Sequence, residues 1–310
     1  MPAEPDAGAT NVASMKIALF SLLTAAMSLS LPAHADIAVA DDFGSEIRLV
    51  APARRIVALA PHLAENLYAA GAGDRLVGTV EYSDYPPAAK AVRRIGNHAR
   101  IDLEAVAALQ PDVVLAWESG NNPAQVERLR ALGLRVFVTQ PGSLADIPGE
   151  IERLGRLAGT EAVARPAADS LRQRLDRLRA ANAGKPVVRT FYQIWKAPLT
   201  TVGGPQIISD AIRLCGGENV FGHLTQMAPT VTVEAVLMAD PEAIVATGMG
   251  DARPEWLSDW EAWPRLTAAR RGNLFHINPD LMQRHTGRLL DGTEQLCARL
   301  DQARSRRPAK

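Results

Sequence analysis

The sequence predicts an α/β protein of two similar lobes, each built on a parallel sheet and joined to the other by a single long backbone helix. Three observations support this fold. Strand-like apolar runs alternate with helical runs, an arginine-rich helical stretch separates the two halves, and two patterns from the first half recur in the second. With 310 residues, 47% of them apolar, the chain can bury a substantial core.

The first half alternates between strand and helix patterns. Because strands that alternate with helices lie parallel, and the helices cover both faces of the sheet, residues 36–144 are expected to form one Rossmann-like lobe. The expected strands are 55–60, 76–80, 113–117 and 136–139, and the expected helices are 63–70, 103–109 and 124–132.

Residues 145–184 have a different character, with leucines and isoleucines at helical spacing among many arginines. This pattern predicts one long linking helix, or two helices broken near Gly159 and Pro166. Acidic residues are interspersed, so the arginine-rich face is interpreted as solvated and not as a nucleic-acid site. The alternation then resumes with a strand at 187–195, and residues 185–310 are expected to form the second lobe.

Two internal repeats support a pair of similar lobes. "DLEAVAALQPDVVLAW", from Asp102, matches "TVEAVLMADPEAIVAT", from Thr232, at an offset of 232 − 102 = 130. "GDRLVG", from Gly73, matches "GENVFG", from Gly217, at an offset of 217 − 73 = 144. A repeat that occurs only twice favours two lobes over a solenoid. Since 144 − 130 = 14, the first lobe carries 14 additional residues within 78–102.

The N-terminus predicts export. A leader is expected over residues 1–35, with a signal peptide over 15–35, and translation starts at the first or at the second methionine. An apolar run at 17–31 precedes an Ala-His-Ala cleavage pattern that ends at Ala35. The alternative is a membrane anchor, but the run is shorter than the roughly 20 apolar residues of a spanning helix. The mature protein is therefore expected in the periplasm.

Charge and motifs argue against several classes of function. Lysine plus arginine equals aspartate plus glutamate, at 34 each, so no net field attracts nucleic acid or an anionic membrane. Gly71 and Gly73 could begin a dinucleotide-binding loop, but Leu76 occupies the third glycine position. No catalytic residue, cofactor or metal site is predicted, and a periplasmic metal-dependent enzyme is the distant alternative. A metal site has little support because the histidines are scattered singly along the chain, at His62, His98, His223, His276 and His285.

A ligand site between the lobes fits the aromatic residues better. Tyr82 follows one expected strand, and Trp117 and Trp195 end two others. Open α/β sheets bind ligands at the carboxyl ends of their strands, and pockets favour domain interfaces with aromatic walls. The alternative is that these aromatics are ordinary core residues.

The cysteines and two glutamates carry further predictions. Export favours a disulfide between Cys215 and Cys297 over two buried free thiols. Asp102 and Thr232 are predicted N-caps, which place Glu104 and Glu234 in the first turns of equivalent helices, where the helix dipole favours their charge. The glutamates would also form a pseudo-symmetric pair suited to a two-fold symmetric partner with basic residues.

These residues resemble the cobalamin-binding branch of the helical-backbone periplasmic binding proteins. That family serves ABC importers and includes carriers of haem and ferric siderophores. The similarity extends over nearly all of the mature chain. Its most specific motifs are "YSDYPP" at 82–87, "LEAVAALQPDVVLAW" at 103–117, "CGGENVF" at 215–221, and "DLMQRHTGR" at 280–288 with "QLC" at 295–297.

The resemblance implies a monomeric carrier that captures cobalamin or a related corrinoid between its lobes and delivers it to an inner-membrane ABC permease. It implies docking through Glu104 and Glu234 and a Cys215–Cys297 disulfide. The candidate ligand contacts are Pro61, Tyr82, His98, Trp117, Ile194, Trp195, Asp280, Leu281, Met282, Gln283 and Arg284.

The chain also departs from the family pattern. His98 and Ala228 stand where cleft tryptophans are expected, and Ile194 replaces a phenylalanine, with Trp195 beside it. Two flat walls are lost and one is regained, which leaves open the exact corrinoid and the affinity. The alternative ligand within the same fold is haem or a ferric siderophore. His98 is interpreted as a polar cleft residue or as an axial ligand to the metal, since neutral imidazole binds metals.

Overall fold

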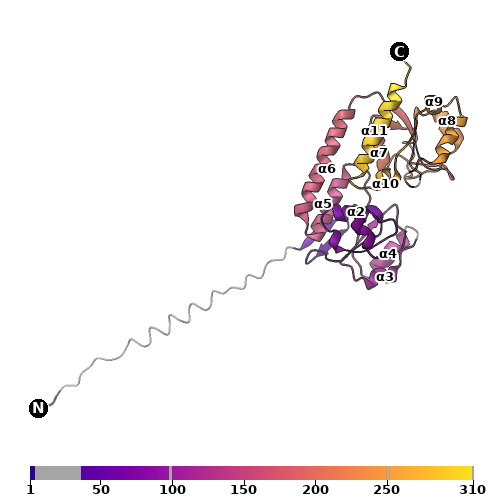
Figure 1. Cartoon of the computed structure of the whole chain (residues 1–310). Helices are drawn as coiled ribbons and strands as arrows, with labels where there is room; N and C mark the ends of the chain where they lie inside the picture. Colours follow the sequence, from indigo (N-terminus) through magenta and orange to yellow (C-terminus); the bar gives the residue numbers. More distant parts are fainter. Residues whose placement is uncertain (4–35, 98–99, 249, 251, 309–310) are drawn as a thin grey trace. The chain divides into compact units, whose positions relative to one another are not determined.

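In the computed structural model, residues 36–310 form one compact unit (Figure 1). The expected signal peptide lies outside the described residues, as does His98. No helix in the part of the chain that the structure describes is long and apolar enough to cross a bilayer. The described residues are 1–3, 36–97, 100–248, 250 and 252–308.

The N-terminal sheet has four parallel strands, as the alternating pattern predicts. Its strands follow the order β4-β3-β5-β6, and a separate antiparallel hairpin, β1-β2, precedes them in the chain. These strands are β1 (Ile37–Ala40), β2 (Glu46–Leu49), β3 (Ile56–Ala58), β4 (Leu76–Thr79), β5 (Val113–Trp117) and β6 (Val136–Thr139).

Helices cover both faces of this sheet. Successive strand residues point to opposite sides, so Ile56 and Val57 of β3 belong to two different apolar clusters. On one side lie α2 (Pro61–Ala69) and α5 (Asp146–Ala158), and on the other lie α3 (Leu103–Ala108) and α4 (Pro123–Ala131). Two 3₁₀ turns, η1 (Gly73–Arg75) and η2 (Pro87–Ala91), complete this part.

The C-terminal sheet repeats the arrangement. Its strands follow the order β11-β10-β7-β8, with β9 also paired to β7, and only β8 runs antiparallel among the described strands of this sheet. The elements are β7 (Val188–Trp195), β8 (Thr200–Thr201), α7 (Ile207–Leu214), β9 (Gly217–Asn219), α8 (Val233–Ala239), β10 (Ala243–Ala246), η3 (Glu255–Ala262), α9 (Thr267–Arg270), β11 (Leu274–His276), α10 (Pro279–Met282) and α11 (Leu289–Ser305).

The internal repeats correspond to equivalent elements. α3 and α8 begin at Leu103 and Val233, which are 130 positions apart, and the strands that follow them keep that offset. The second repeat is less regular. β4 and β9 each pair with the first strand of their sheet, but β4 begins at the fourth residue of its repeat and β9 at the first. The repeat therefore predicts strand order but not register.

The linking segment contains two helices. α5 ends at Gly159, whose φ of 65° is left-handed, and α6 (Glu161–Asn182) follows. Glycine adopts this conformation without steric cost, which explains the break. Pro166, by contrast, lies inside α6 without ending it. The long helix between the two sheets is α6, which packs against α5, α7 and α11 (Figure 1).

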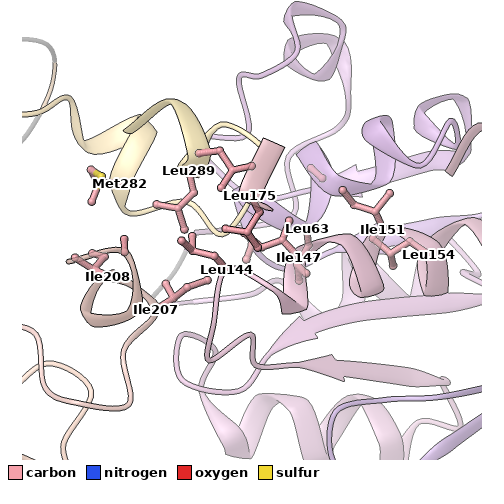
Figure 2. Packing of buried hydrophobic residues seen from close by; sticks show 14 of the residues in the cluster. Leu63, Leu144, Ile147, Ile151, Leu154, Leu175, Ile207, Ile208, Met282 and Leu289 are labelled. Carbon is pink, nitrogen blue, oxygen red and sulfur yellow. The ribbon is translucent and has the colours of Figure 1, made fainter. Parts of the chain in front are cut away.

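One apolar cluster is shared by both halves. It includes Leu63 of α2, Ile147 of α5, Leu175 of α6, Ile207 of α7 and Leu289 of α11, all almost fully buried (Figure 2). The cluster faces one side of the N-terminal sheet and one side of the C-terminal sheet. The two lobes are therefore joined by a common core as well as by α6.

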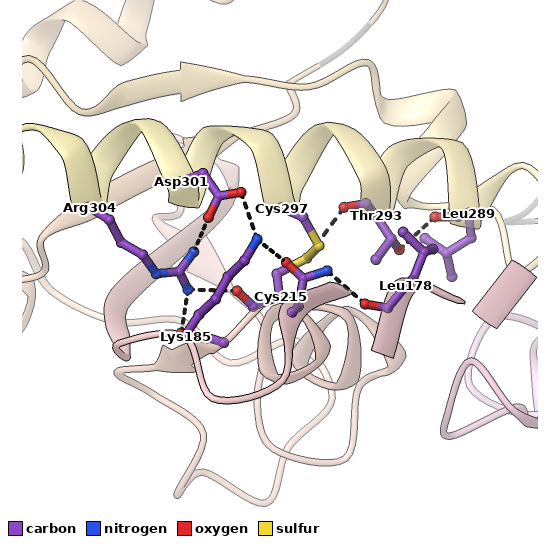
Figure 3. Close-up of a disulfide and its surroundings, with 10 residues drawn as sticks. Leu178, Lys185, Cys215, Leu289, Thr293, Cys297, Asp301 and Arg304 are labelled. Carbon is purple, nitrogen blue, oxygen red and sulfur yellow. Dashed lines mark hydrogen bonds and ion pairs between the residues drawn. A yellow bond between two sulfur atoms is a disulfide. The ribbon is translucent and has the colours of Figure 1, made fainter. Parts of the chain in front are cut away.

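The predicted disulfide is confirmed. Cys215 at the end of α7 and Cys297 within α11 are bonded, with their Cα atoms 4.7 Å apart (Figure 3). Beside it, Lys185 pairs with Asp301 of α11 at 2.8 Å, and Arg304 donates a hydrogen bond to the carbonyl of Cys215. These contacts fix α11 to the start of the C-terminal lobe.

Candidate functional site

The loop between β4 and α3 carries Tyr82 and is held at its base by its own lobe. We call residues 80–97 the tyrosine loop. Ser83 hydrogen bonds through its hydroxyl to that of Thr79 at 2.8 Å, and Arg94 donates to the carbonyl of Ser83 at 2.8 Å. Tyr82 itself has a left-handed φ of 64° and a side chain that is 67% exposed. Its ring is therefore available to a ligand.

The tyrosine loop meets a C-terminal segment that we call the arginine segment, residues 279–288. Arg284 donates to Asp84 of the loop at 2.8 Å and also pairs with Asp280 at 2.9 Å. Burial acts to raise the pKa of Asp84, but the hydrogen bond and charge of Arg284 outweigh it and hold that pKa below its usual value. Two of the sequence-predicted motifs are thus in direct contact.

Arg288 makes a second connection between the lobes. Its guanidinium lies 3.9 Å from the ring centroid of Tyr85 and binds Glu65 of α2 through two hydrogen bonds of 2.8 and 2.7 Å. The Glu65 side chain is 6% exposed. Its hydrogen bonds raise the pKa of Arg288 above the ordinary value, so the guanidinium stays charged.

Three rings form a cluster in which His62 and His285 are buried and Trp117 is half-buried. The ring centroids of His62, Trp117 and His285 lie 5.0 to 5.4 Å apart in edge-on or tilted arrangements. Burial, with a smaller contribution from His285 and Arg284, lowers the pKa of His62 well below its usual value. Burial lowers that of His285 to about 4. Both imidazoles are therefore neutral at pH 7.

A buried carboxyl group lies next to this cluster. Asn66 of α2 donates from its amide to Glu150 of α5 and to the backbone carbonyl of His285, both at 2.9 Å. Burial raises the pKa of Glu150 to about 7, and the hydrogen bond from Asn66 offsets part of that effect. The carboxyl group is thus about half protonated at neutral pH.

The remaining predicted ligand residues are placed as follows. Trp117 ends β5 and is half-buried, while Trp195 ends β7 and is 39% exposed. Gln283 donates to Thr247 at 2.8 Å. Met282, within the arginine segment, is fully buried in the shared core. Pro61 at the start of α2, Ile194 in β7, and Leu281 and Asp280 in the arginine segment are half-buried.

The two glutamates lie where the sequence predicts. Asp102 accepts a hydrogen bond from the Ala105 amide at 2.9 Å, and Thr232 accepts one from the Ala235 amide at 3.2 Å, which confirms both N-caps. Glu104 and Glu234, in the first turns of α3 and α8, are exposed. Hydrogen bonds from its own backbone N–H and from Thr232 lower the pKa of Glu234, so its charge persists in mildly acidic solution.

Two cavities are lined by other residues. One, of about 1240 Å³, follows β1 and α5 and includes Asp41, Glu152 and Arg156. The other, of about 550 Å³, lies beside α8 and includes Leu237 and Trp263. No residue predicted to contact a ligand lines either of them.

The sequence reasoning missed Glu65, Asn66, Glu150 and Arg288. Their partners are far away in the chain, and Glu65 and Arg288 are 223 positions apart. A signal was present in "HLAEN" (62–66), where polar residues occupy a short helix that is buried on every side.

Similar proteins are known by sequence. The profile of the periplasmic binding protein family matches residues 56–281. A vitamin B12-binding protein of Vibrio cholerae is 38% identical over 249 residues, which are 80% of this chain and 90% of that protein. A vitamin B12-binding protein of Yersinia pestis is 33% identical over 248 residues, 80% of this chain and 86% of that protein.

Solved structures agree with the sequence relatives. The crystal structure of the periplasmic vitamin B12-binding protein of Vibrio cholerae matches with a TM-score of 0.76 and 37% identity, covering 82% of this chain and 98% of the other. A periplasmic haem-binding protein of Pseudomonas aeruginosa matches with a TM-score of 0.69 and 26% identity, covering 79% and 92%. From the extent of these matches, the chain belongs to the periplasmic binding protein family.

Proposed function

We propose that this protein captures cobalamin or a related corrinoid in the periplasm and delivers it to an ABC importer in the inner membrane. The contact between the tyrosine loop and the arginine segment carries the proposal, because it joins two motifs shared with cobalamin carriers. The 38% identity to a vitamin B12-binding protein supports it. The protein itself does no covalent chemistry.

In this proposal the ligand lies between the N-terminal lobe, residues 36–144, and the C-terminal lobe, residues 185–310, with 145–184 as the helical link. Tyr82 is 67% exposed and would pack on the macrocycle or its side groups. Trp117, Trp195, Pro61, Ile194 and Leu281 would add apolar wall, and Met282 would support the arginine segment from the core.

Polar contacts would come from the arginine segment. Asp280 and Gln283 would bind the amide side chains of a corrin or its nucleotide tail. The guanidinium of Arg284 already pairs with Asp84 and Asp280, which fix its orientation, so it would be prealigned when it contacts the ligand. A prealigned donor binds more tightly than a flexible one because less side-chain freedom is lost.

Titration calorimetry tests the ligand class. We expect cyanocobalamin and cobinamide to bind, and Tyr82→Ala to weaken both. Phe43→Ala is a matched control, because Phe43 is also an exposed aromatic, at 56%, but belongs to the β1-β2 turn. Absence of heat with both corrinoids would reject the proposal.

Haem is the second candidate. The match to a haem-binding protein and the exposed phenol of Tyr82 favour it, since tyrosine oxygen is a haem ligand. A haemin spectrum that changes on mixing with the protein, and changes less with Tyr82→Phe, would support haem. Haemin spectra that do not change with either the wild type or Tyr82→Phe would reject haem as the ligand.

A further inference from the structure

We propose that Arg288 is a positioning residue for the ligand site: from the C-terminal lobe it fixes the tyrosine loop of the N-terminal lobe and thereby places Tyr82. The inference deepens the proposed function and rests on it for the role of Tyr82. Arg288 itself need not touch the ligand.

The tyrosine loop is supported from two directions. Its own lobe holds its base through Ser83 and Arg94. The next two residues along the loop depend on the opposite lobe: Asp84 is bound by Arg284, and the ring of Tyr85 lies against Arg288 at 3.9 Å. Tyr85 is 43% exposed, and the guanidinium covers part of the ring that is not exposed.

Arg288 can serve as a support because it is itself held in place. Glu65 binds it through both carboxylate oxygens, at 2.8 and 2.7 Å, from the buried helix α2. Two parallel hydrogen bonds fix the plane of a guanidinium, and a planar cation can then lie against an aromatic ring. A lysine in this place would keep the charge but would lose both the second hydrogen bond and the flat contact.

The backbone of Tyr82 needs such support. Its φ of 64° is uncommon for a residue with a side chain. A conformation of this kind persists only where neighbouring contacts hold it, and such positions cluster at ligand sites. Tyr82 directly precedes Ser83, which is held at the base, and lies two and three positions before Asp84 and Tyr85, which the opposite lobe contacts. Loss of the contacts from the opposite lobe should let the tyrosine loop change conformation and displace the Tyr82 ring.

Hydrogen exchange of the free protein tests the support directly. We expect Arg288→Lys and Tyr85→Leu to speed amide exchange at least fivefold within residues 80–97, while exchange in α6 stays unchanged. Arg174→Lys is the matched control, because Arg174 also pairs with two carboxylates, Asp291 and Glu294, but joins α6 to α11. Unchanged exchange of the tyrosine loop in both variants would overturn the proposal.

Affinity for cyanocobalamin tests the link to Tyr82. We expect Arg288→Lys to weaken binding about tenfold, the scale of one desolvated cation–π contact. In a Tyr82→Ala background the same change should alter affinity by less than about twofold, because Arg288 acts through that ring. Equal losses in both backgrounds would overturn the role of Arg288. If the wild-type protein does not bind cyanocobalamin, the proposed function is rejected instead. The hydrogen-exchange measurement would still decide whether Arg288 supports the tyrosine loop.

Discussion

Glu65 and Arg288 join α2 to the residue that precedes α11 through two hydrogen bonds of 2.8 and 2.7 Å, with side chains only 6% and 19% exposed. Arg288→Met would leave the Glu65 carboxylate buried without its partner. Loss of one partner of a buried ion pair costs about 3 to 5 kcal/mol. We expect a loss of about 3 kcal/mol in the free energy of unfolding by urea.

The double variant Glu65→Leu with Arg288→Met is the informative control, because it removes both charges. We expect it to be more stable than Arg288→Met alone. If the double variant loses as much unfolding free energy as the two single variants together, the unpaired buried charge is not the cause of the destabilisation.

The disulfide closes a loop of 82 positions between α7 and α11. Replacing both Cys215 and Cys297 by alanine should lower the free energy of unfolding by about 4 kcal/mol, chiefly through the greater freedom of the unfolded chain. Thermal unfolding with and without reductant measures this. Reductant should lower the melting temperature of the wild type and leave that of the double variant unchanged; equal sensitivity of the two proteins would contradict the prediction.

Glu150 makes stability fall as pH rises. Its pKa is raised from 4.5 to about 7 in the folded protein, so between these values the folded state keeps a proton that the unfolded state releases. Glu150→Gln removes this pH-dependent loss of stability, because glutamine does not titrate. We expect the variant to gain stability relative to wild type as pH rises from 4.5 to 7, by up to about 1.4 kcal/mol per pH unit.

Urea unfolding at pH 5 and pH 7 measures the effect, and Glu152→Gln is the control on the same helix. The hydrogen bond from Arg172 lowers the pKa of Glu152, so that carboxylate stabilises the fold above its ordinary pKa and loses this contribution on acidification. Both test pH values lie above that ordinary pKa of 4.5, so the stability difference between Glu152→Gln and wild type should be nearly the same at pH 5 and pH 7. A stability difference for Glu150→Gln that does not change with pH would disprove the assignment.

Glu104 and Glu234 are expected to bind basic residues of the permease. Glu104→Arg combined with Glu234→Arg should abolish transport in reconstituted vesicles and leave ligand affinity unchanged. Reversing charge in the first turn of a helix costs about 0.3 to 1 kcal/mol, too little to unfold the protein. Glu161→Arg, in the first turn of α6, is the control for that cost. Transport that persists would leave helix capping as the whole role of the two glutamates.

The sequence predicts the local elements well. The strand Val113–Trp117 and its counterpart Ala243–Ala246 are short apolar runs behind capped helices, and both ends of α3 carry clear signals in Asp102 and Pro111. The disulfide follows from export and an even number of cysteines. Of the two alternatives for residues 145–184, one long helix or two helices, the structure has two; the break lies at Gly159, whereas α6 continues through Pro166.

The connections between the lobes could not be predicted. Arg284 and Asp84 are 200 positions apart, and Arg288 resembles any surface arginine in a sequence rich in them. Neighbouring residues specify a helix, but the partner of a buried charge depends on how the whole chain folds. Two motifs drawn from the sequence are in contact through Asp84 and Arg284, whereas the residues that hold them, such as Glu65, were missed.

The shared apolar cluster also bears on how the protein unfolds. Leu63 and Ile147 from the first half pack in the same cluster as Ile207 and Leu289 from the second. Neither half can bury this surface alone, so exposing one half exposes a face of the other. Although the described residues form two large sheets besides the β1-β2 hairpin, and contain an internal repeat, calorimetry should record a single cooperative transition, and neither half should accumulate as a folded intermediate.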